Sequence, residues 1–339
     1  MSVMTRRTLL GALATSPLWL QPAWAQATSL NISHQFPGGN VAEGDFRDRL
    51  CRMFAERAER ATRGKLKFAI HPASSLMKSE AQIPALSKGT LDLALVPLSY
   101  AGADFPEVNI GLLPGLVTSY DQGYAWKNQD VGREFKRMLG ERGMVILSWI
   151  WQAGGVASRG KPIVAPDDAA GLKVRGGSHA MDLILKQAGA TVVDIPSNEI
   201  RRALQSGSLD AAMTSSSSLI SFRLDEVSKS VTTARGGAYW FMLEPLMMSK
   251  TVFDRLPREQ QAALLKIGAD LEGFARKSAQ MDDAAVASLF AGHGGRTADL
   301  NATSLRKWQE IARTTAWRDF GERNANCAKL LALAEKTVV

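Results

Sequence analysis

The segment Gly176–Ala180 (GGSHA) holds residue types that could support nucleophilic chemistry, because its serine stands between a predicted strand and a predicted helix. In the nucleophile elbow of a hydrolase, such a serine attacks an acyl group after a downstream acid and histidine have activated it. His293 is the only histidine placed to serve, and Ala180 stands where the elbow needs glycine. The simpler interpretation is that Ser178 caps the following helix, whose N-terminus offers N–H groups to an anion. An exported serine hydrolase that uses Ser178 is therefore one of two functions that the sequence leaves open; the other is derived below.

Metal and nucleotide chemistry have little support. The four histidines, His34, His71, His179 and His293, show no metal-ligand spacing, and neither H-E-x-x-H nor Cys-x-x-Cys occurs. No Walker loop or G-x-G-x-x-G motif opens a helix after a strand. We therefore predict no metal, no cofactor and no bound nucleotide.

The charge balance is basic, with 41 Lys+Arg against 33 Asp+Glu in 339 residues and a formal net charge of +8. Such a balance can indicate a nucleic acid or an anionic membrane as partner. The densest basic run extends from Arg57 to Lys67, and acids stand at helical ion-pair spacing from two of its arginines, Glu56 from Arg60 and Glu59 from Arg63. We interpret this run as a solvated helix face and predict no nucleic-acid partner.

Residues 1–25 are typical of a cleavable export signal. Arg6-Arg7 precede a mostly apolar run from Leu9 to Leu20, and Ala23-Trp24-Ala25 supplies the small residues of a cleavage site. The run is shorter than the roughly 20 residues that span a bilayer. We predict a periplasmic protein, exported by the general route or by the twin-arginine route, whose pattern the arginine pair fits loosely.

The predicted elements place the candidate residues in an α/β fold. Strands and helices alternate over the first part of the chain, at 29–35, 41–62, 65–70, 78–87 and 90–97. This order predicts a largely parallel sheet with helices on its faces. A helix at 121–139 and a strand at 144–151 follow, and the same alternation then repeats from Leu172 to Met213.

An apolar strand up to Ser249 and two long helices, at 258–290 and 304–334, complete the chain. We therefore predict two α/β lobes joined by more than one crossing. Cys51 and Cys327 lie at opposite ends of the chain in predicted helices. Export permits a disulfide between them, and two separate buried thiols are the alternative.

Several short motifs occur in an order that resembles one family. They are GLKVR at 171–175, GA at 189–190, PSNE at 196–199, ALQSG at 203–207 and LD at 209–210. The chain resembles the solute-binding proteins of TRAP transporters, of the DctP type. Segments at 34–39, 64–66, 72–76, 89–92 and 161–168 are similar to that family as well. The likeness covers nearly the whole chain after the predicted signal.

The resemblance implies a two-lobed periplasmic-binding-protein fold, with lobes joined by crossing strands and a long helix. We expect residues 26–152 and 240–279 in lobe I and residues 153–239 and 280–339 in lobe II. It also implies a non-enzymatic receptor that closes over a small organic acid and delivers it to TRAP membrane permease subunits. The receptor is expected to be a monomer or a homodimer.

The same resemblance assigns the ligand carboxylate to Arg175. Arginine holds a carboxylate bidentately and stays charged when buried, and a strand end before a helix is where open α/β sheets bind ligands. The further candidates for ligand binding are Thr214, Ser178, Ser215, Arg159, Tyr100, Ser99, Phe36, Trp240 and Tyr239.

Two positions depart from the sialic-acid-binding members of that family. Thr214 stands where those members have asparagine, and Gly155 stands where they have a second arginine, the nearest here being Arg159. A sialic-acid ligand is therefore not expected, and the sequence does not identify the acid.

Overall fold

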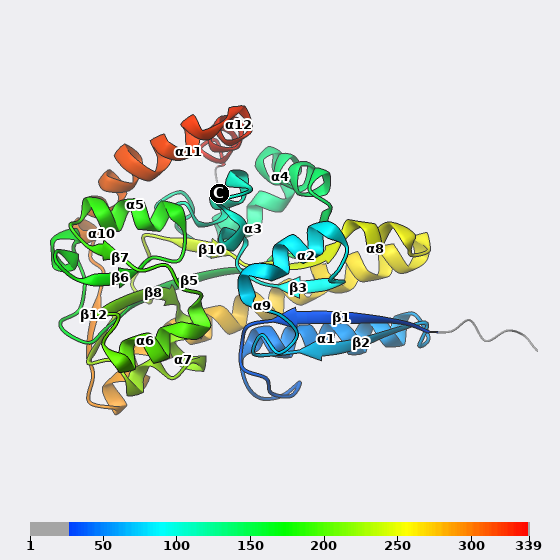
Figure 1. Ribbon diagram of the computed structural model, residues 1–339, viewed down its shortest axis with the longest axis horizontal. Coiled ribbons are helices and arrows are strands. Elements are labelled where there is room, and N and C mark those ends of the chain that lie inside the picture. The colour runs from blue at the N-terminus through cyan, green and yellow to red at the C-terminus, as the bar shows by residue number, and fades with distance from the viewer. Residues whose placement is uncertain (1–26, 338–339) are drawn as a thin grey trace, which may run out of the picture.

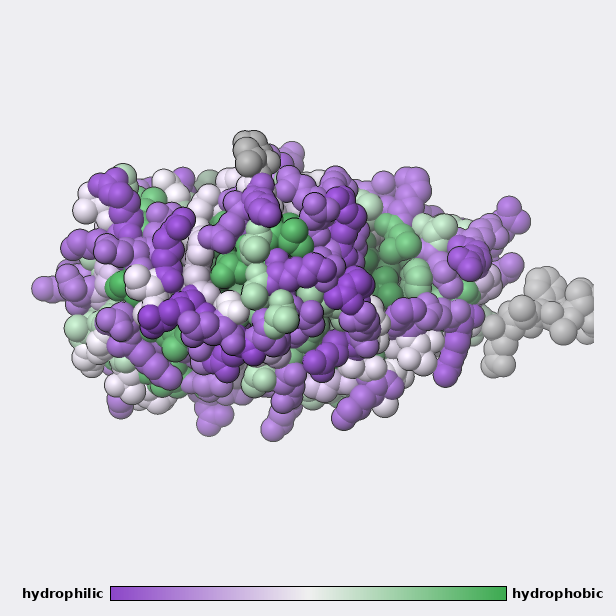
Figure 2. All heavy atoms as spheres, turned by 90° about the horizontal axis from the view of Figure 1, so that it is seen from above, coloured by the Kyte–Doolittle hydropathy of each residue, from purple (hydrophilic) through white to green (hydrophobic). Residues whose placement is uncertain are grey.

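The computed structural model, which describes residues 27–337, contains two α/β lobes that each have one β-sheet (Figure 1). The predicted export signal lies in residues 1–25, outside the described residues. Among residues 27–337, no helix is both long and apolar enough to cross a membrane. On the face shown in Figure 2, hydrophilic side chains surround smaller hydrophobic patches.

The first sheet has the strand order β2-β1-β3-β11-β4. Its strands are β1 (Thr28–His34), β2 (Leu66–His71), β3 (Leu93–Leu95), β4 (Met144–Ser148) and β11 (Leu246–Ser249). The neighbouring helices are α1 (Phe46–Ala61), α2 (Gln82–Lys88), α3 (Tyr120–Ala125), α4 (Asp130–Glu141) and α8 (Lys250–Arg255), with short turns η1 (Ser79–Ala81), η2 (Leu98–Ala101), η3 (Pro106–Leu112) and η4 (Trp126–Asn128). Strand β1 pairs in parallel with both β2 and β3, as the alternation of strands and helices predicted.

The second sheet has the order β12-β9-β5-β8-β6-β7, and β10 pairs with β5. Its strands are β5 (Trp151–Ser158), β6 (Lys173–Arg175), β7 (Thr191–Val192), β8 (Ala211–Ser215), β9 (Ser230–Thr233), β10 (Phe241–Leu243) and β12 (Arg296–Asp299). Its helices are α5 (His179–Gln187), α6 (Ile200–Ser206) and α7 (Ser216–Ser221), with turns η5 (Pro166–Ala169), η6 (Ser197–Glu199) and η7 (Leu224–Glu226). A separate apolar cluster under α6 and α7 includes Leu204, Leu219 and Phe290.

Two strand connections and one long helix link the lobes. The chain leaves the first sheet at Ser148 and enters the second at Trp151, and it returns between Leu243 and Leu246. The two connections touch where the Glu244 N–H donates to the Ile150 carbonyl at 2.9 Å. Helix α9 (Arg258–Gly292) contacts α1 and β4 of the first lobe as well as β5 and α7 of the second.

Helix α1 shows how the local sequence determines packing. Leu50, Phe54 and Ala58 recur at helical spacing and are fully buried, while Asp45 caps the helix by accepting from the Arg47 N–H at 2.9 Å. Its outer face carries ion pairs, as predicted, but Glu59 pairs with Lys67 of β2 at 2.9 Å and not with Arg63. Arg63 lies beyond the end of the helix with a φ of 52°, so the helical spacing no longer applies to it.

Two predicted long helices are interrupted. The segment predicted at 121–139 is divided at Gln129, whose backbone is extended between α3 and α4. The C-terminal segment forms α10 (Ala302–Ala312), a π-turn at Arg313–Trp317, α11 (Arg318–Arg323) and α12 (Ala325–Ala334). Asn324 is extended and caps α12, because its side chain accepts from the Cys327 N–H. Cys51 and Cys327 are both free and buried, so the alternative of two separate thiols is the one observed.

Candidate functional site

Arg175 ends strand β6 in a buried position, with only 5% of its surface exposed. Its Nε donates to the Ile195 carbonyl at 3.0 Å and its Nη1 to the Met213 carbonyl at 2.8 Å, while Nη2 lies 3.4 Å from the Tyr100 hydroxyl. Among residues 27–337, no carboxylate lies within ion-pair distance of it. Neutral oxygens therefore orient the buried Arg175 guanidinium, and its charge acts at longer range on Asp182, whose pKa burial and Asp194 raise to about 7 against the opposing effect of Arg175.

The glycines after Arg175 allow the chain to pass close to the guanidinium. Gly177 has a φ of +92°, and a Cβ at this position would lie 2.5 Å from Arg175 Nη1. Ser178 then caps α5, as predicted, by accepting from the Met181 N–H at 3.1 Å. His293 lies beyond the end of α9 and pairs with Asp225 at 2.8 Å. In the described part of the chain, the Ser–His pair that a hydrolase needs is not formed at Ser178.

A small cavity lies between the lobes beside Arg175. Its volume is about 20 Å³, which is room for about one water molecule, so the lobes must move apart before a larger molecule can enter. The residues that line it are Pro97, Tyr100, Leu112, Arg175, Gly176, Gly177, Ser197, Met213, Thr214, Ser215, Ser218, Trp240, Met242 and Glu244. Both lobes and the returning connection contribute to these walls. Larger and more open hollows occur at the surface, beside Met281 and beside Arg159.

Two buried polar atoms of residues that line this cavity have no hydrogen-bond partner. They are the indole Nε1 of Trp240 and the Oε1 of Glu244. Burial raises the pKa of Glu244 to about 7, although Arg47 and Gln152 both oppose this shift. A buried donor or acceptor without a partner is costly, so a molecule in the cavity that bonded to either atom would remove that cost.

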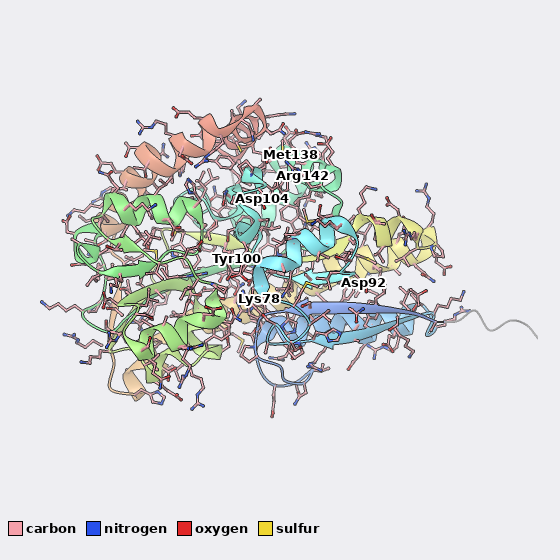
Figure 3. All side chains as sticks on the ribbon, in the orientation of Figure 1. Lys78, Asp92, Tyr100, Asp104, Met138 and Arg142 are labelled. Atoms are coloured by element: carbon pink, nitrogen blue, oxygen red, sulfur yellow. The ribbon has the colours of Figure 1, made fainter. Side chains whose placement is uncertain are left out.

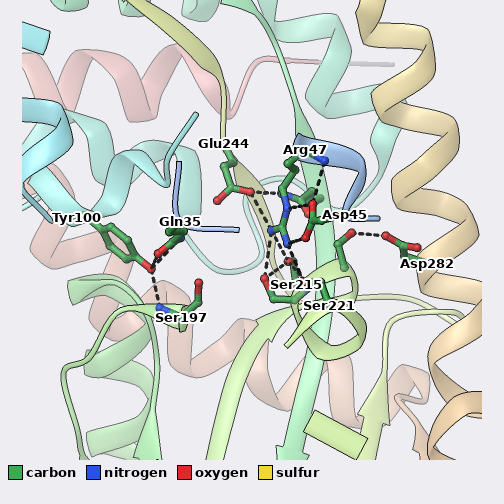
Figure 4. A network of polar contacts seen from close by, with 12 residues as sticks. Gln35, Asp45, Arg47, Tyr100, Ser197, Ser215, Ser221, Glu244 and Asp282 are labelled. Atoms are coloured by element: carbon green, nitrogen blue, oxygen red, sulfur yellow. Dashed lines mark hydrogen bonds and ion pairs between the residues drawn. The ribbon is translucent and has the colours of Figure 1, made fainter. Parts of the chain in front are cut away.

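A second buried arginine lies next to the cavity in a very different environment (Figure 4). Arg47 donates to Asp45 from Nε at 2.9 Å and from Nη2 at 2.6 Å, and its Nη1 lies 3.2 Å from Glu244 Oε2. Burial alone would lower the pKa of Arg47, but the carboxylates of Asp45 and Glu244 more than offset this and raise it. The Nη1 also donates to Ser218 at 3.1 Å and Ser215 at 3.3 Å, across the boundary between the lobes.

Tyr100 connects the lobes at the other side of the cavity (Figure 3). Its hydroxyl accepts from the Ser197 N–H at 2.9 Å and from Gln35 Nε2 at 3.3 Å. Next to it, the Ser99 hydroxyl donates to the Gly177 carbonyl at 3.0 Å. The bonds to Ser197 and Gly177 join turn η2 of the first lobe to the second lobe.

The structure brings five of the ten predicted ligand-binding residues to the cavity, namely Arg175, Thr214, Ser215, Tyr100 and Trp240. The other five lie elsewhere. Ser99 and Ser178 line a neighbouring surface hollow. Phe36 lies under the Arg47 guanidinium, 3.6 Å from ring centroid to Cζ, and Tyr239 is in the core, stacked on Trp308. Arg159 is half-exposed at the surface, where it lies 3.9 Å from Asp210.

Sequence reasoning missed Glu244, Ser218 and Arg47. Two of them carry a signal that could have found them. Arg47 shares the inward face of α1 with Leu50, Cys51 and Phe54, where a charged residue is unusual. Glu244 is the only charged residue in the apolar run from Tyr239 to Ser249. Ser218 offers no comparable signal, because it is one of four consecutive serines.

Gly155 of β5 has no room for a side chain in this structure. A Cβ there would lie 2.0 Å from the Thr232 carbonyl oxygen, because β9 pairs closely with β5 at this point. Gly154 is confined in the same way, 2.4 Å from the Trp240 ring. Within residues 27–337, no group of three or more His, Cys, Asp or Glu side chains could hold a metal ion.

Comparison with known proteins gives a consistent result. Residues 38–324 match the DctP family, described as bacterial extracellular solute-binding protein, family 7. A "solute-binding protein" of Albidiferax ferrireducens is 58% identical over 338 residues, covering 99% of this chain and 100% of the relative. A TRAP periplasmic solute-binding protein of Rhodoferax ferrireducens, solved with bound malonate, superposes with a TM-score of 0.90 at 60% identity, covering 91% of this chain and 98% of that structure. The C4-dicarboxylate-binding periplasmic protein DctP of Rhodobacter capsulatus is 24% identical over 91% of this chain and 92% of its own length.

Proposed function

Because this chain belongs to the DctP family of bacterial extracellular solute-binding proteins, the periplasmic receptors of TRAP transporters, we propose that Arg175 holds the carboxylate of a small organic acid in the cavity between its lobes. One observation carries this proposal: Arg175 is buried, lines the cavity between the lobes and forms no ion pair among the described residues. A buried charge without a counter-ion is unfavourable by several kcal/mol, and an anionic ligand would remove that cost.

A short dicarboxylate is the ligand we favour. The relative from Rhodoferax ferrireducens was solved with malonate, and the cavity beside Arg175 is small, so a short acid needs the least movement of the lobes to enter it. Thr214, Ser215 and Trp240 would surround the acid, and the Trp240 Nε1–H is free to donate to one of its oxygens. These contacts would select among acids by their size and by the position of their second acidic group.

The wider role follows from family membership. We propose that residues 1–25 direct export, that the receptor is not an enzyme, and that it delivers its acid to TRAP membrane permease subunits, working as a monomer or a homodimer. We also propose that the lobes divide near residues 152 and 240 and that they rotate about the two strand connections and α9 when the ligand binds.

A thermal-shift panel of small acids tests the proposal. Malonate at a hundred times its Kd should stabilise the purified protein by about 2.7 kcal/mol, whereas a neutral analogue should not. Arg175→Ala should abolish the shift, since truncation of one partner of a buried charge pair costs about 2–5 kcal/mol of binding free energy. Arg159→Ala is the matched control and should keep the shift, because Arg159 lies at the surface.

The panel also shows how the proposal would fail. If no mono- or dicarboxylate, keto acid or sugar acid raises the melting temperature, the protein is not a receptor for small acids. If Arg175→Ala still responds as the unchanged protein does, the carboxylate lies elsewhere.

A further inference from the structure

Glu244 lines the same cavity as Arg175 and is the acidic residue among those that line it. Its two oxygens have different surroundings. Oε2 accepts from Arg47 Nη1 at 3.2 Å and from Gln152 Nε2, whereas Oε1 is buried and has no partner. Figure 4 shows one oxygen turned toward Arg47 and the other turned away from it.

We propose that Glu244 is a second ligand-binding group, and that it holds a dicarboxylate as a neutral carboxylic acid by donating an Oε1–H hydrogen bond to one ligand oxygen. This inference rests on the proposed function, because it requires an acid bound at Arg175. It adds a consequence that Arg175 alone does not have: ligand binding takes up a proton from solvent.

The geometry favours the protonated form once a dicarboxylate is present. Every oxygen of such a ligand is a hydrogen-bond acceptor, so the groups around it must be donors. An ionised Glu244 would instead turn a bare acceptor oxygen toward it. A proton on Oε1 converts that acceptor into a donor, while Oε2 keeps its bonds to Arg47 and Gln152.

The charges around Glu244 also favour its protonated form when a dicarboxylate is bound. Arg47 and Asp45 face it from the start of α1, and Arg175 lines the same cavity from β6. With Glu244 ionised, these four groups have no net charge, so a dianion would leave two uncompensated negative charges in a buried space. A proton on Glu244 removes one of them.

Two further titratable groups lie near this cluster, Asp182 on α5 and Asp282 on α9. Burial and Asp194 raise the pKa of Asp182 to about 7, with Arg175 opposing the shift, but Asp182 lines the neighbouring hollow and not the cavity. Asp282 accepts from the Ser217 hydroxyl at 2.5 Å, and its pKa is raised to about 6 by burial, with Arg47 opposing the shift. It is therefore mainly ionised at neutral pH and adds further negative charge on the far side of Arg47. The pKa of the ligand-free Glu244, about 7, places its own titration within reach of experiment.

The affinity for malonate should fall as the pH rises through the pKa of Glu244. Below the pKa of ligand-free Glu244, the carboxyl is already protonated and malonate binds without proton uptake. Above it, each unit of pH should weaken malonate binding by up to about tenfold, because a proton must be captured first. Acetate has no second carboxylate to accept the bond, so its weaker binding should change less with pH.

Calorimetric titration with malonate, in two buffers that differ in ionisation enthalpy, measures this proton directly. The unchanged protein should take up close to one proton at about pH 8 and much less at about pH 6. Glu244→Gln places a permanent donor where the acid proton would be. It should bind malonate with no proton uptake and with a Kd that is constant from about pH 7 to about pH 9.

Glu272→Gln is the matched control. Glu272 is also buried with a raised pKa, but it pairs with Lys127 and the Trp149 N–H and does not line the cavity. This variant should keep the proton uptake of the unchanged protein. Uptake that persists in Glu244→Gln would assign the proton to another group and overturn the inference.

The unchanged protein alone decides the outcome if the variant fails to fold. Binding of malonate with no proton uptake and a Kd independent of pH would refute the role of Glu244 and leave Arg175 as the ligand-binding group. Failure of every acid to bind would instead refute the proposed function itself.

Discussion

The two buried arginines lie on either side of one cavity and differ in what surrounds them. Arg47 has two carboxylates, three serine hydroxyls and the Phe36 ring around its guanidinium, so its charge and its N–H groups are satisfied within the protein. Arg175 has two backbone carbonyls and a distant phenol. The same residue type therefore has a paired charge at one position and an unpaired charge at the other. Arg47 bonds to groups of both lobes, whereas Arg175 forms no ion pair among the described residues, which is why we propose Arg175 as the group that binds the ligand.

Replacement of each arginine by alanine should separate these roles most clearly. Arg47→Ala leaves Asp45 and Glu244 buried without their counter-ion and should lower the free energy of unfolding by about 3–5 kcal/mol. Arg175→Ala removes no ion pair of the ligand-free protein and should cost much less stability. Urea denaturation without ligand measures both.

The control for Arg47 lies on the same helix. Arg60 makes an exposed ion pair with Glu56 at 3.8 Å, and Arg60→Ala should cost at most about 1 kcal/mol. Equal losses of stability for Arg47→Ala and Arg175→Ala would show that the contrast between the two environments has no energetic meaning.

A smaller effect is expected at Trp240, whose unpartnered Nε1–H lines the cavity. Trp240→Phe should weaken malonate binding by about 1.5–3 kcal/mol, the range for a hydrogen bond to a charged group. Trp126 also has a buried Nε1 without a partner but does not line the cavity. Trp126→Phe should therefore leave the malonate Kd unchanged. Calorimetry on both variants distinguishes an unpartnered N–H that lines the cavity from one that is buried elsewhere in the core.

The smallest effect is expected at Tyr100, which bridges the lobes beside Arg175. Tyr100→Phe removes a hydroxyl that accepts from the Ser197 N–H and should weaken binding by about 0.5–1.5 kcal/mol. A large loss, comparable to that of Arg175→Ala, would make Tyr100 a primary ligand contact and place the carboxylate closer to the first lobe.

Much of the fold could be predicted from the sequence because local signals were strong. Helix α9 was predicted at 258–290 and spans 258–292, since apolar residues repeat along it without a break. The apolar run that ends at Ser249 was predicted as one strand, yet it forms β10 and β11 in different sheets. That division depends on where two lobes meet, which no local pattern contains.

The residues of the candidate site could also be predicted only in part, because local sequence patterns do not show which distant residues meet. Motif resemblance pointed to Arg175, and the structure brings Thr214, Ser215, Tyr100 and Trp240 to its cavity. Glu244 and Arg47 were missed because their meaning depends on each other: one is a lone acid in an apolar run and the other a lone base on an apolar helix face. Only the fold brings the two together.

The place of Glu244 in the returning connection has a mechanical consequence. It belongs to neither sheet, and its N–H bonds to Ile150 of the other connection. In a rotation of the lobes about these connections, Glu244 lies near the axis, where the lever arm is short and displacement is small. Arg175 and Tyr100 lie on opposing lobes, where a small angle opens a wide gap. Contacts at the axis can persist while the outer ones break, so the acid would leave the receptor from its outer end first.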